Sequence, residues 1–484
     1  MVHRFEMSGK YIAYDSESCA LHELDEMSYD LLGLFIDADG KRPDTDIIKK
    51  LSEGKKYSMG ELIECADDFD ELINAEELFA CEQNVPFTSL YPEEPLIKAM
   101  CLHISHDCNL RCKYCFAGTG DFGSGNRCHL SLETGKQAVD FLIAASGKRR
   151  NLDIDFFGGE PLMNWQVVKE LTFYCEQKSR ETGKDIRLTI TTNCILLDEE
   201  KTDFINQHMK NCVLSIDGRP EVTNHMRPGI GGADSYPLIA KRIRDFLKKR
   251  TAQDSPNYEH YVRGTYTREN LDFSKDVIHL AEELGARHIS VEPVVAEEGS
   301  GYEIRLEDLP AIEKEYELLA AYIMKRKMTD DPVHFFHFVI DQQGGPCLFK
   351  RLKGCGVGAE YCAVTPEGDI YPCHQFAGNP EMKLGNVRDM INITDAEGSL
   401  IHGKKATDIL SPDTRKIFTD RLMPDKPDCR KCFSRYHCGG GCPANAYHAT
   451  GDLDGMYEIG CRLAKKRLEC SLWMSVMQNE SDSL

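Results

Sequence analysis

The stretch CNLRCKYC at residues 108–115 decides the fold, because it places three cysteines in a C-x3-C-x2-C loop after an apolar strand candidate at 100–104. Three thiolates this close together can hold three corners of a cubane iron–sulfur cluster and leave the fourth iron open. A structural zinc site usually takes four ligands. Cys128 could complete such a site, but twelve residues separate it from Cys115. The loop therefore favours an iron–sulfur cluster over zinc.

Strand and helix patterns alternate along the chain from this loop onward. The strand candidates are 100–104, 152–157, 186–192, 212–216, 258–266 and 288–293. The helical patterns between them lie near 131–145, 165–181, 198–209, 235–250 and 272–284. Strands separated by helices indicate βαβ units and a parallel sheet. The pattern predicts an α/β fold, a partial (β/α)6 barrel, with its site at the C-terminal ends of the strands.

Composition excludes several classes of function. The chain has 484 residues and a formal net charge of −21, which disfavours binding to the phosphate backbone of nucleic acid. No apolar run is long enough to span a bilayer, and the N-terminus lacks the apolar stretch of a signal peptide. A cytoplasmic location without membrane contact is therefore expected. In a reducing compartment, the 21 cysteines point to metal binding or catalysis before disulfides.

Two further motifs follow predicted strands. FGGEP at 157–161 closes the second strand, where Gly158 and Gly159 would let the backbone approach a ligand and Glu160 offers a carboxylate. Ser215 and Asp217 belong to the segment SIDG, which ends the fourth strand. Each motif is also found in ordinary turns. Their positions at strand ends favour a binding role.

Cysteines are again dense between residues 347 and 461, where hydrophobic periodicity is weak. Cys355, Gly368 and Cys373 form one block, and a C-x2-C-x5-C-x3-C block runs from Cys429 to Cys442, before Cys461. Zinc ribbons are the alternative interpretation of paired cysteines. The segment 363–371 is expected to be a hairpin with Cys362 and Cys373 at its ends. We expect metal to hold this region together.

Residues 1–90 form a separate pattern, with loose alternation over 4–24 followed by helical spacing near 27–35, 45–52 and 59–79. A hairpin or short antiparallel sheet ahead of helices is expected. The segment YPEEP at 91–95 is typical of a linker. An N-terminal cap on the barrel is the purely structural alternative.

With these motifs in place, the chain resembles the radical S-adenosylmethionine (SAM) superfamily. The resemblance implies that Cys108, Cys112 and Cys115 bind the cluster whose open iron chelates SAM, and that the cleaved SAM yields a 5′-deoxyadenosyl radical. The same resemblance implies a cofactor-binding role for seven residues. These are Tyr114 near the adenine, Gly158, Gly159 and Glu160 near the ammonium group, and Ser215, Asp217 and Arg227 near the ribose and carboxylate. It names no general base, and His103 and His106 beside the loop are expected to be structural.

The C-terminal cysteines resemble the SPASM domain, which carries auxiliary [4Fe–4S] clusters. The first auxiliary cluster would use Cys355, Cys373 and Cys442, with Cys362 or Cys347 as a possible fourth ligand. The resemblance assigns the second auxiliary cluster to Cys429, Cys432, Cys438 and Cys461. Three [4Fe–4S] clusters per chain follow, one of them binding SAM.

The stretch from Cys101 to Gly123 resembles thioether-forming maturases of six-cysteines-in-forty-five peptides and related ranthipeptides. The resemblance implies residues 1–90 as a PqqD-like, winged-helix-like recognition element, 96–300 as the barrel, 301–346 as a helical bridge and 347–484 as the SPASM domain. The partners implied are a Cys-containing ribosomal precursor peptide, bound through its leader, and an electron donor such as a flavodoxin or ferredoxin. The alternatives are an anaerobic sulfatase-maturase-like enzyme that makes formylglycine and a non-enzymatic, zinc-dependent peptide-binding scaffold.

Overall fold

Six parallel strands form the central barrel in the computed structural model, which describes residues 1–54, 57–82, 94–251, 259–340, 347–395, 399 and 401–482. They are β4 (Ala99–Ser105), β5 (Asn151–Gly158), β6 (Asp185–Thr192), β7 (Asn211–Ser215), β8 (Glu259–Tyr266) and β9 (His288–Pro293). Each strand pairs in parallel with the next one along the chain. The alternating pattern in the sequence therefore predicted the barrel strands correctly.

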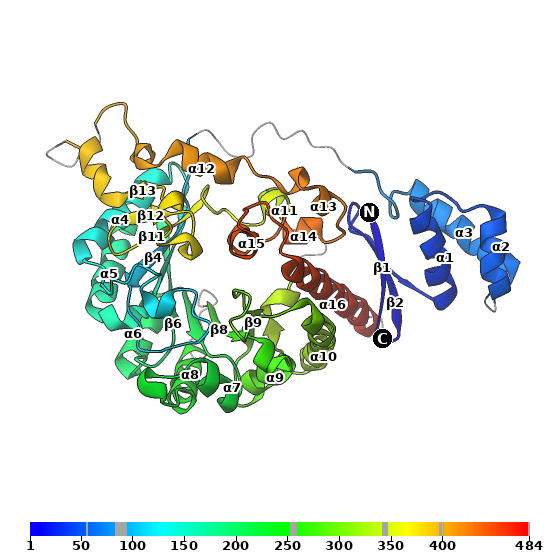
Figure 1. The fold of residues 1–484 in the computed structure, drawn as a ribbon, viewed down its shortest axis with the longest axis horizontal. Helices are drawn as coiled ribbons and strands as arrows, with labels where there is room; N and C mark the ends of the chain where they lie inside the picture. Colours follow the sequence, from blue (N-terminus) through cyan, green and yellow to red (C-terminus); the bar gives the residue numbers. More distant parts are fainter. Residues whose placement is uncertain are drawn as a thin grey trace.

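Helices cover the outer face of this sheet (Figure 1). They are α4 (Leu132–Ala145), α5 (Trp165–Thr182), α6 (Glu199–His208), α7 (Pro220–Met226), α8 (Tyr236–Thr251) and α9 (Phe273–Glu282). Local chemistry fixes several of their ends: Ser131 accepts a hydrogen bond from the first turn of α4, and Gly183 ends α5 in a left-handed conformation. The short α7 was not predicted from the sequence.

The sheet continues beyond the barrel on both sides. Its order is β10-β9-β8-β7-β6-β5-β4-β11-β12-β13, with β10 (His334–Phe335) parallel to β9 and β11 (Tyr361–Val364) parallel to β4. The strands β12 (Asp369–Tyr371) and β13 (Gly385–Asn386) complete an antiparallel edge. The expected hairpin at 363–371 is present, but it extends the barrel sheet. Backbone pairing with β4 therefore contributes to holding the Cys-dense region in place.

The described residues after the barrel form two long helices, α10 and α16, and several short ones. They are α10 (Leu309–Lys327), α11 (Leu348–Lys353), α12 (Pro412–Thr419), α13 (Pro427–Arg430), α14 (Arg435–Cys438), α15 (Pro443–Thr450) and α16 (Glu458–Asp482). The long helix α16 lies beside α10, where Arg462 pairs with Glu313 at 2.6 Å and Lys466 with Glu317 at 2.5 Å. Among the described residues, no helix is long and apolar enough to cross a membrane.

The N-terminal module is a three-stranded antiparallel sheet with three helices. The elements are β1 (Val2–Met7), β2 (Lys10–Asp15), β3 (Leu21–Leu24), α1 (Glu26–Asp37), α2 (Thr45–Gly54) and α3 (Met59–Asn74). Val2 and Ala13 pack against the helices, whereas Phe5, Ile12 and Tyr14 belong to the main hydrophobic core. The small sheet is therefore buried on both faces. Residues 91–93 of the predicted linker lie outside the described part of the chain.

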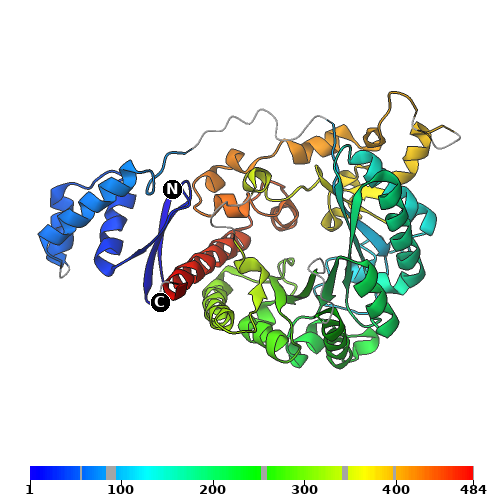
Figure 2. The ribbon, with the colours of Figure 1, turned by 180° about the vertical axis from the view of Figure 1, so that it is seen from behind.

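Aromatic and polar contacts join this module to the segment around α14 (Figures 1 and 2). The His3 ring stacks on Phe433 with centroids 3.6 Å apart. Tyr14 Oη contacts His437 Nε2 at 3.1 Å. Tyr436 Oη donates to Glu17 at 2.8 Å, and Arg435 also pairs with Glu17. The contact combines aromatic stacking with an ion pair whose two side chains are each about 5% exposed. We name these contacts the module junction.

Candidate functional site

A cavity of about 430 Å³ lies at the C-terminal ends of the barrel strands, where a site was expected. Cys108, Cys112 and Cys115 line it from the loop after β4. Three cysteines of the C-terminal region also line it: Cys438, Cys442 and Cys461. One cavity thus joins the two groups of cysteines that the sequence separates by more than 300 residues.

The thiols of the first loop suit a metal cluster. Burial raises the pKa of Cys108 to about 11 and that of Cys112 to about 12, so without metal both are thiols. Leu110 N–H donates to Cys108 Sγ at 3.4 Å, and the Asn193 side-chain amide lies 3.6 Å from the same sulfur. Donors directed at a sulfur stabilise a metal-bound thiolate. The donor set therefore fits a cluster held by three cysteines.

Gly158 and Gly159 are required by close packing of backbone. A Cβ on Gly158 would lie 2.3 Å from Ser105 O, and one on Gly159 would lie 2.2 Å from Asp107 O. Their segment is also hydrogen-bonded to the chain leading into Cys108, since Gly159 N–H donates to Ser105 O at 2.7 Å. Both glycines line the cavity. Their immediate role is to bring the loop after β5 against the cluster loop.

Glu160 lies behind the cavity wall and is fully buried. Its carboxylate accepts hydrogen bonds from Leu162 N–H at 3.0 Å, Thr192 Oγ1 at 2.8 Å and Asn193 N–H at 2.7 Å. Burial raises its pKa to about 7. The side chain expected near the SAM ammonium group is thus engaged with the protein. Its position assigns it to holding the ends of β5 and β6 together.

Tyr114, Asp217 and Arg227 form a buried hydrogen-bonded group beside the cavity. Tyr114 Oη donates to Asp217 at 2.7 Å and accepts from Arg227 at 2.7 Å, and Arg227 lies 3.5 Å from the Asp217 carboxylate. Tyr114, Arg227 and Ser215 line the cavity. Asp217 is not among the lining residues and contacts Tyr114 and Arg227 from behind the cavity wall. The structure therefore brings together residues that the sequence places more than 100 positions apart.

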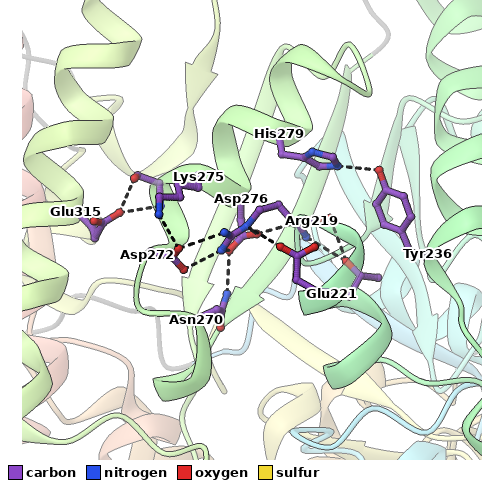
Figure 3. Close-up of polar contacts among 12 residues, drawn as sticks. Arg219, Glu221, Tyr236, Asn270, Asp272, Lys275, Asp276, His279 and Glu315 are labelled. Carbon is purple, nitrogen blue, oxygen red and sulfur yellow. Dashed lines mark hydrogen bonds and ion pairs between the residues drawn. The ribbon is translucent and has the colours of Figure 1, made fainter.

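A second polar network fixes the turn that follows Asp217 (Figure 3). Asp276 accepts hydrogen bonds from Arg219 N–H at 3.0 Å, Arg219 Nε at 2.8 Å and Asn270 Nδ2 at 3.1 Å. Asp272 pairs with the same guanidinium at 2.7 Å. Gly218 has φ +149°, and its missing Cβ would lie 2.3 Å from Asp276 Cβ. The network holds the turn against α9.

Replacing Asp276 with Asn should lower the melting temperature and weaken the binding of SAM. The neutral side chain keeps its shape but leaves Arg219 with weaker acceptors, at a cost of about 1–3 kcal/mol. The matched control is Lys275→Ala on the same helix, because Lys275 is exposed and its pair with Asp272 is a surface contact. Thermal unfolding and SAM-binding titration measure both effects. Equal stability of the two variants would contradict a role for the network.

The C-terminal cysteines separate into two groups. Burial raises the pKa of Cys355 and of Cys373, and the nearby Cys442 thiol raises both further, which places these three cysteines in one group. Burial raises the pKa of Cys438 and of Cys461, and the nearby Cys429 and Cys432 thiols raise both further, which places these four cysteines in a second group. Cys347 is exposed at the start of α11.

The structure does not bring Cys362 to the first group. Its neighbour Ala363 pairs with Cys101, and both pack in one apolar cluster with Cys373. Cys362 belongs to the main core, which lies on the other face of β11 because side chains alternate along a strand. The assignment of Cys362 as a ligand therefore has no support from its position.

Several residues that line the cavity were not predicted from the sequence, among them Arg263, Glu292 and His374. Arg263 and Glu292, which form an ion pair at 2.8 Å, lie near the C-terminal ends of β8 and β9. That position was the signal that could have found them. His374 follows the hairpin and also lines the cavity. All three line the same cavity as the two groups of cysteines.

Residues 102–246 match the Radical SAM superfamily, and residues 355–433 match SPASM, an iron–sulfur cluster-binding domain. The chain contains a radical SAM domain followed by a SPASM domain. The two domains imply SAM and iron–sulfur clusters, including auxiliary clusters, as cofactors. The SPASM match ends before Cys438, Cys442 and Cys461, so their assignment depends on the geometry.

Two curated relatives cover most of the chain. A serine-type anaerobic sulfatase-maturating enzyme of Bacteroides thetaiotaomicron is 24% identical over 372 residues, which are 71% of this chain and 82% of the relative. An AdoMet-dependent heme synthase of Oleidesulfovibrio alaskensis is 26% identical over 324 residues, which are 63% of this chain and 76% of the relative. The radical SAM–SPASM domain pair is thus similar to enzymes of different chemistry.

Solved structures show the same fold. The enzyme anSMEcpe with bound AdoMet has a TM-score of 0.60 at 20% identity, over 79% of this chain and 99% of that chain. Streptococcus suis SuiB bound to precursor peptide SuiA has a TM-score of 0.51 at 16% identity, over 95% of this chain and 98% of that chain. The α/β barrel with a C-terminal SPASM domain is therefore confirmed.

Proposed function

We propose that this radical SAM enzyme is a peptide maturase that joins a cysteine sulfur to a carbon of another residue in a ribosomal precursor peptide. The observation that carries the proposal is the shared cavity. Its walls hold Cys112 of the radical SAM loop and Cys442 of the SPASM domain, so a peptide segment inside it can face both. A substrate thiol and a substrate C–H bond can then be held in one enclosure.

Bound SAM and its cluster would supply the 5′-deoxyadenosyl radical that abstracts a hydrogen atom from the peptide. An auxiliary cluster would accept the one electron released when the cysteine thiol loses its proton and its sulfur bonds to the carbon radical. The chain's own residues bind and orient. Tyr114 and Arg227 present a hydrogen-bonded surface to SAM, while Gly158 and Gly159 contribute backbone at the cavity wall. The cavity volume of about 430 Å³ lies in the range of small-molecule sites. An electron donor such as a flavodoxin or ferredoxin completes the proposed system.

Two resemblances support a peptide substrate. The sulfatase-maturating relative and SuiB, which has been solved with a precursor peptide, share the fold of this chain. The stretch 101–123 resembles thioether-forming maturases, and this resemblance favours the thioether over other products. A formylglycine-forming enzyme is the second candidate, favoured by the similarity to the sulfatase-maturating enzyme.

The N-terminal module is proposed to bind the leader of the peptide. Both faces of its sheet are covered, so strand edges remain as the sites where a peptide can add. The strand β3 is last in the order β1-β2-β3 and is partly exposed. An extended peptide pairing with β3 would gain affinity through backbone hydrogen bonds and specificity through alternate side chains.

The product of a reconstituted reaction tests the proposal. We expect each thioether to remove two hydrogens from the peptide and to protect one cysteine from both alkylation and thiol reduction, because a thioether does not exchange with thiols. The measurement is tandem mass spectrometry of a Cys-rich peptide encoded beside the enzyme. An aldehyde on a single cysteine would replace this proposal with formylglycine formation. A purified protein that held zinc and only traces of iron would support the zinc-dependent scaffold instead.

A further inference from the structure

We propose that His106, Cys128 and Glu367 bind a single zinc ion at a site separate from the iron–sulfur clusters. The three side chains each direct one ligand atom into a common space, with all three atoms within 4.8 Å of one another. His106 follows β4, Cys128 precedes α4, and Glu367 lies in the turn between β11 and β12. The site would join the barrel to the hairpin of the SPASM domain.

The His106 ring is buried, and among the described residues one of its nitrogens is free to bind a metal. It is 3% exposed, and its Nδ1 has no hydrogen-bond partner among the described residues. Its other nitrogen, Nε2, lies 3.0 Å from His103 Nδ1. If Nε2 carries the proton and donates it to His103, then Nδ1 is left as a lone pair. A zinc-binding histidine is usually oriented in this way by a partner on its second nitrogen.

The Cys128 and Glu367 side chains already meet. Cys128 Sγ donates to Glu367 Oε1 at 3.1 Å, so a proton now occupies the position between two zinc ligands. Zinc binding would release this thiol proton to water and join Zn²⁺ to a thiolate, a carboxylate and a neutral imidazole. The charges of the ion and its ligands then sum to zero, which suits a half-buried site. Nitrogen, sulfur and oxygen ligands together are typical of zinc, with a fourth position left for water.

Backbone contacts hold the ligands in place before any metal arrives. His106 N–H donates to Cys128 O at 2.8 Å, which fixes the two ligands to one another. Gly368 N–H donates to Thr365 O at 2.9 Å across the turn that carries Glu367. Asn386 Nδ2 donates to Glu367 O at 3.1 Å from the neighbouring strand β13. A pre-formed site of this kind binds metal with little loss of chain entropy.

The test uses the full-length enzyme after anaerobic reconstitution of its iron–sulfur clusters, so that the cluster cysteines are occupied by iron. The protein is then incubated with one equivalent of Zn²⁺ and desalted. We expect about one zinc per chain by mass spectrometry, with X-ray absorption at the zinc edge showing one sulfur at about 2.3 Å and light-atom neighbours at about 2.0–2.2 Å. Zinc should also raise the melting temperature.

The variants Cys128→Ser and Glu367→Gln should each lower zinc affinity by more than about tenfold and remove the thermal shift, while the iron content stays unchanged. Cys81→Ser is the matched control, because Cys81 is exposed and belongs to none of the cysteine groups. Zinc with three or four sulfur neighbours, or zinc retained in both variants, would overturn the proposal. Failure to retain stoichiometric zinc in the parent enzyme would overturn it as well. None of these outcomes depends on the proposed peptide reaction.

Discussion

Cys112→Ala should reduce the formation of 5′-deoxyadenosine from SAM by more than about 100-fold, because changing even a residue that only supports a metal ligand costs about 10–100-fold. Cys112 lies between Cys108 and Cys115 in the loop, and the three line one wall of the cavity. Loss of one thiol leaves two ligands for a cluster that needs three. Chromatography of the reaction with SAM and dithionite measures the product.

The control for this experiment is Cys81→Ala. Cys81 is exposed and outside the cavity, so the variant should cleave SAM at the parent rate. Iron analysis of both proteins completes the comparison. With three cubane clusters the parent should hold roughly twelve irons per chain, and Cys112→Ala roughly eight. Undiminished SAM cleavage in Cys112→Ala would place the SAM-binding cluster elsewhere in the chain.

Cys442→Ala should stop modification of the peptide while SAM cleavage continues within about threefold of the parent, since the radical SAM loop is untouched. Cys442 lines the same cavity as that loop and belongs to the group with Cys355 and Cys373. Removing it should cost this auxiliary cluster and roughly four irons. Mass spectrometry of the peptide and chromatography of 5′-deoxyadenosine separate the two activities.

The iron content of Cys362→Ala, compared with that of Cys442→Ala, tests whether Cys362 is a cluster ligand. Its side chain lies in the main core on the other face of β11, so the variant should keep all its iron and lose about 2 kcal/mol or less of stability from the deleted sulfur. If Cys362→Ala lost iron as Cys442→Ala does, Cys362 would be a ligand after all. The structural grouping of the C-terminal cysteines would then be wrong.

The barrel could be predicted from the sequence because its signals are local. Each strand is a short apolar run followed by an amphipathic helix, and the observed bounds of β6, Asp185–Thr192, lie within one residue of the predicted 186–192. The cluster loop was equally visible, because its three cysteines lie within eight residues. By contrast, β10 is only two residues long, and it is a strand because it pairs with β9. A segment this short has no sequence pattern that predicts a strand.

The details of the site depended on contacts that no local pattern encodes. Glu160 accepts hydrogen bonds from three protein donors, and the motif around it does not predict these contacts. The face of β11 on which Cys362 lies follows from its register with β4. His106, Cys128 and Glu367 converge only because β11 pairs in parallel with β4 and so brings the hairpin over the end of the first strand.

The module junction limits how this enzyme can be re-engineered. The N-terminal module is not an independent domain joined only by a linker. Phe5 and Tyr14 belong to the main core, and Glu17 forms a buried ion pair with Arg435. A chimera that exchanged the module at the 91–95 segment alone would expose this apolar face and leave Arg435 without its buried partner. His3 also lies 2.9 Å from Glu469 of α16. Successful grafts should therefore carry the surface of α14 and the part of α16 around Glu469 together with the module.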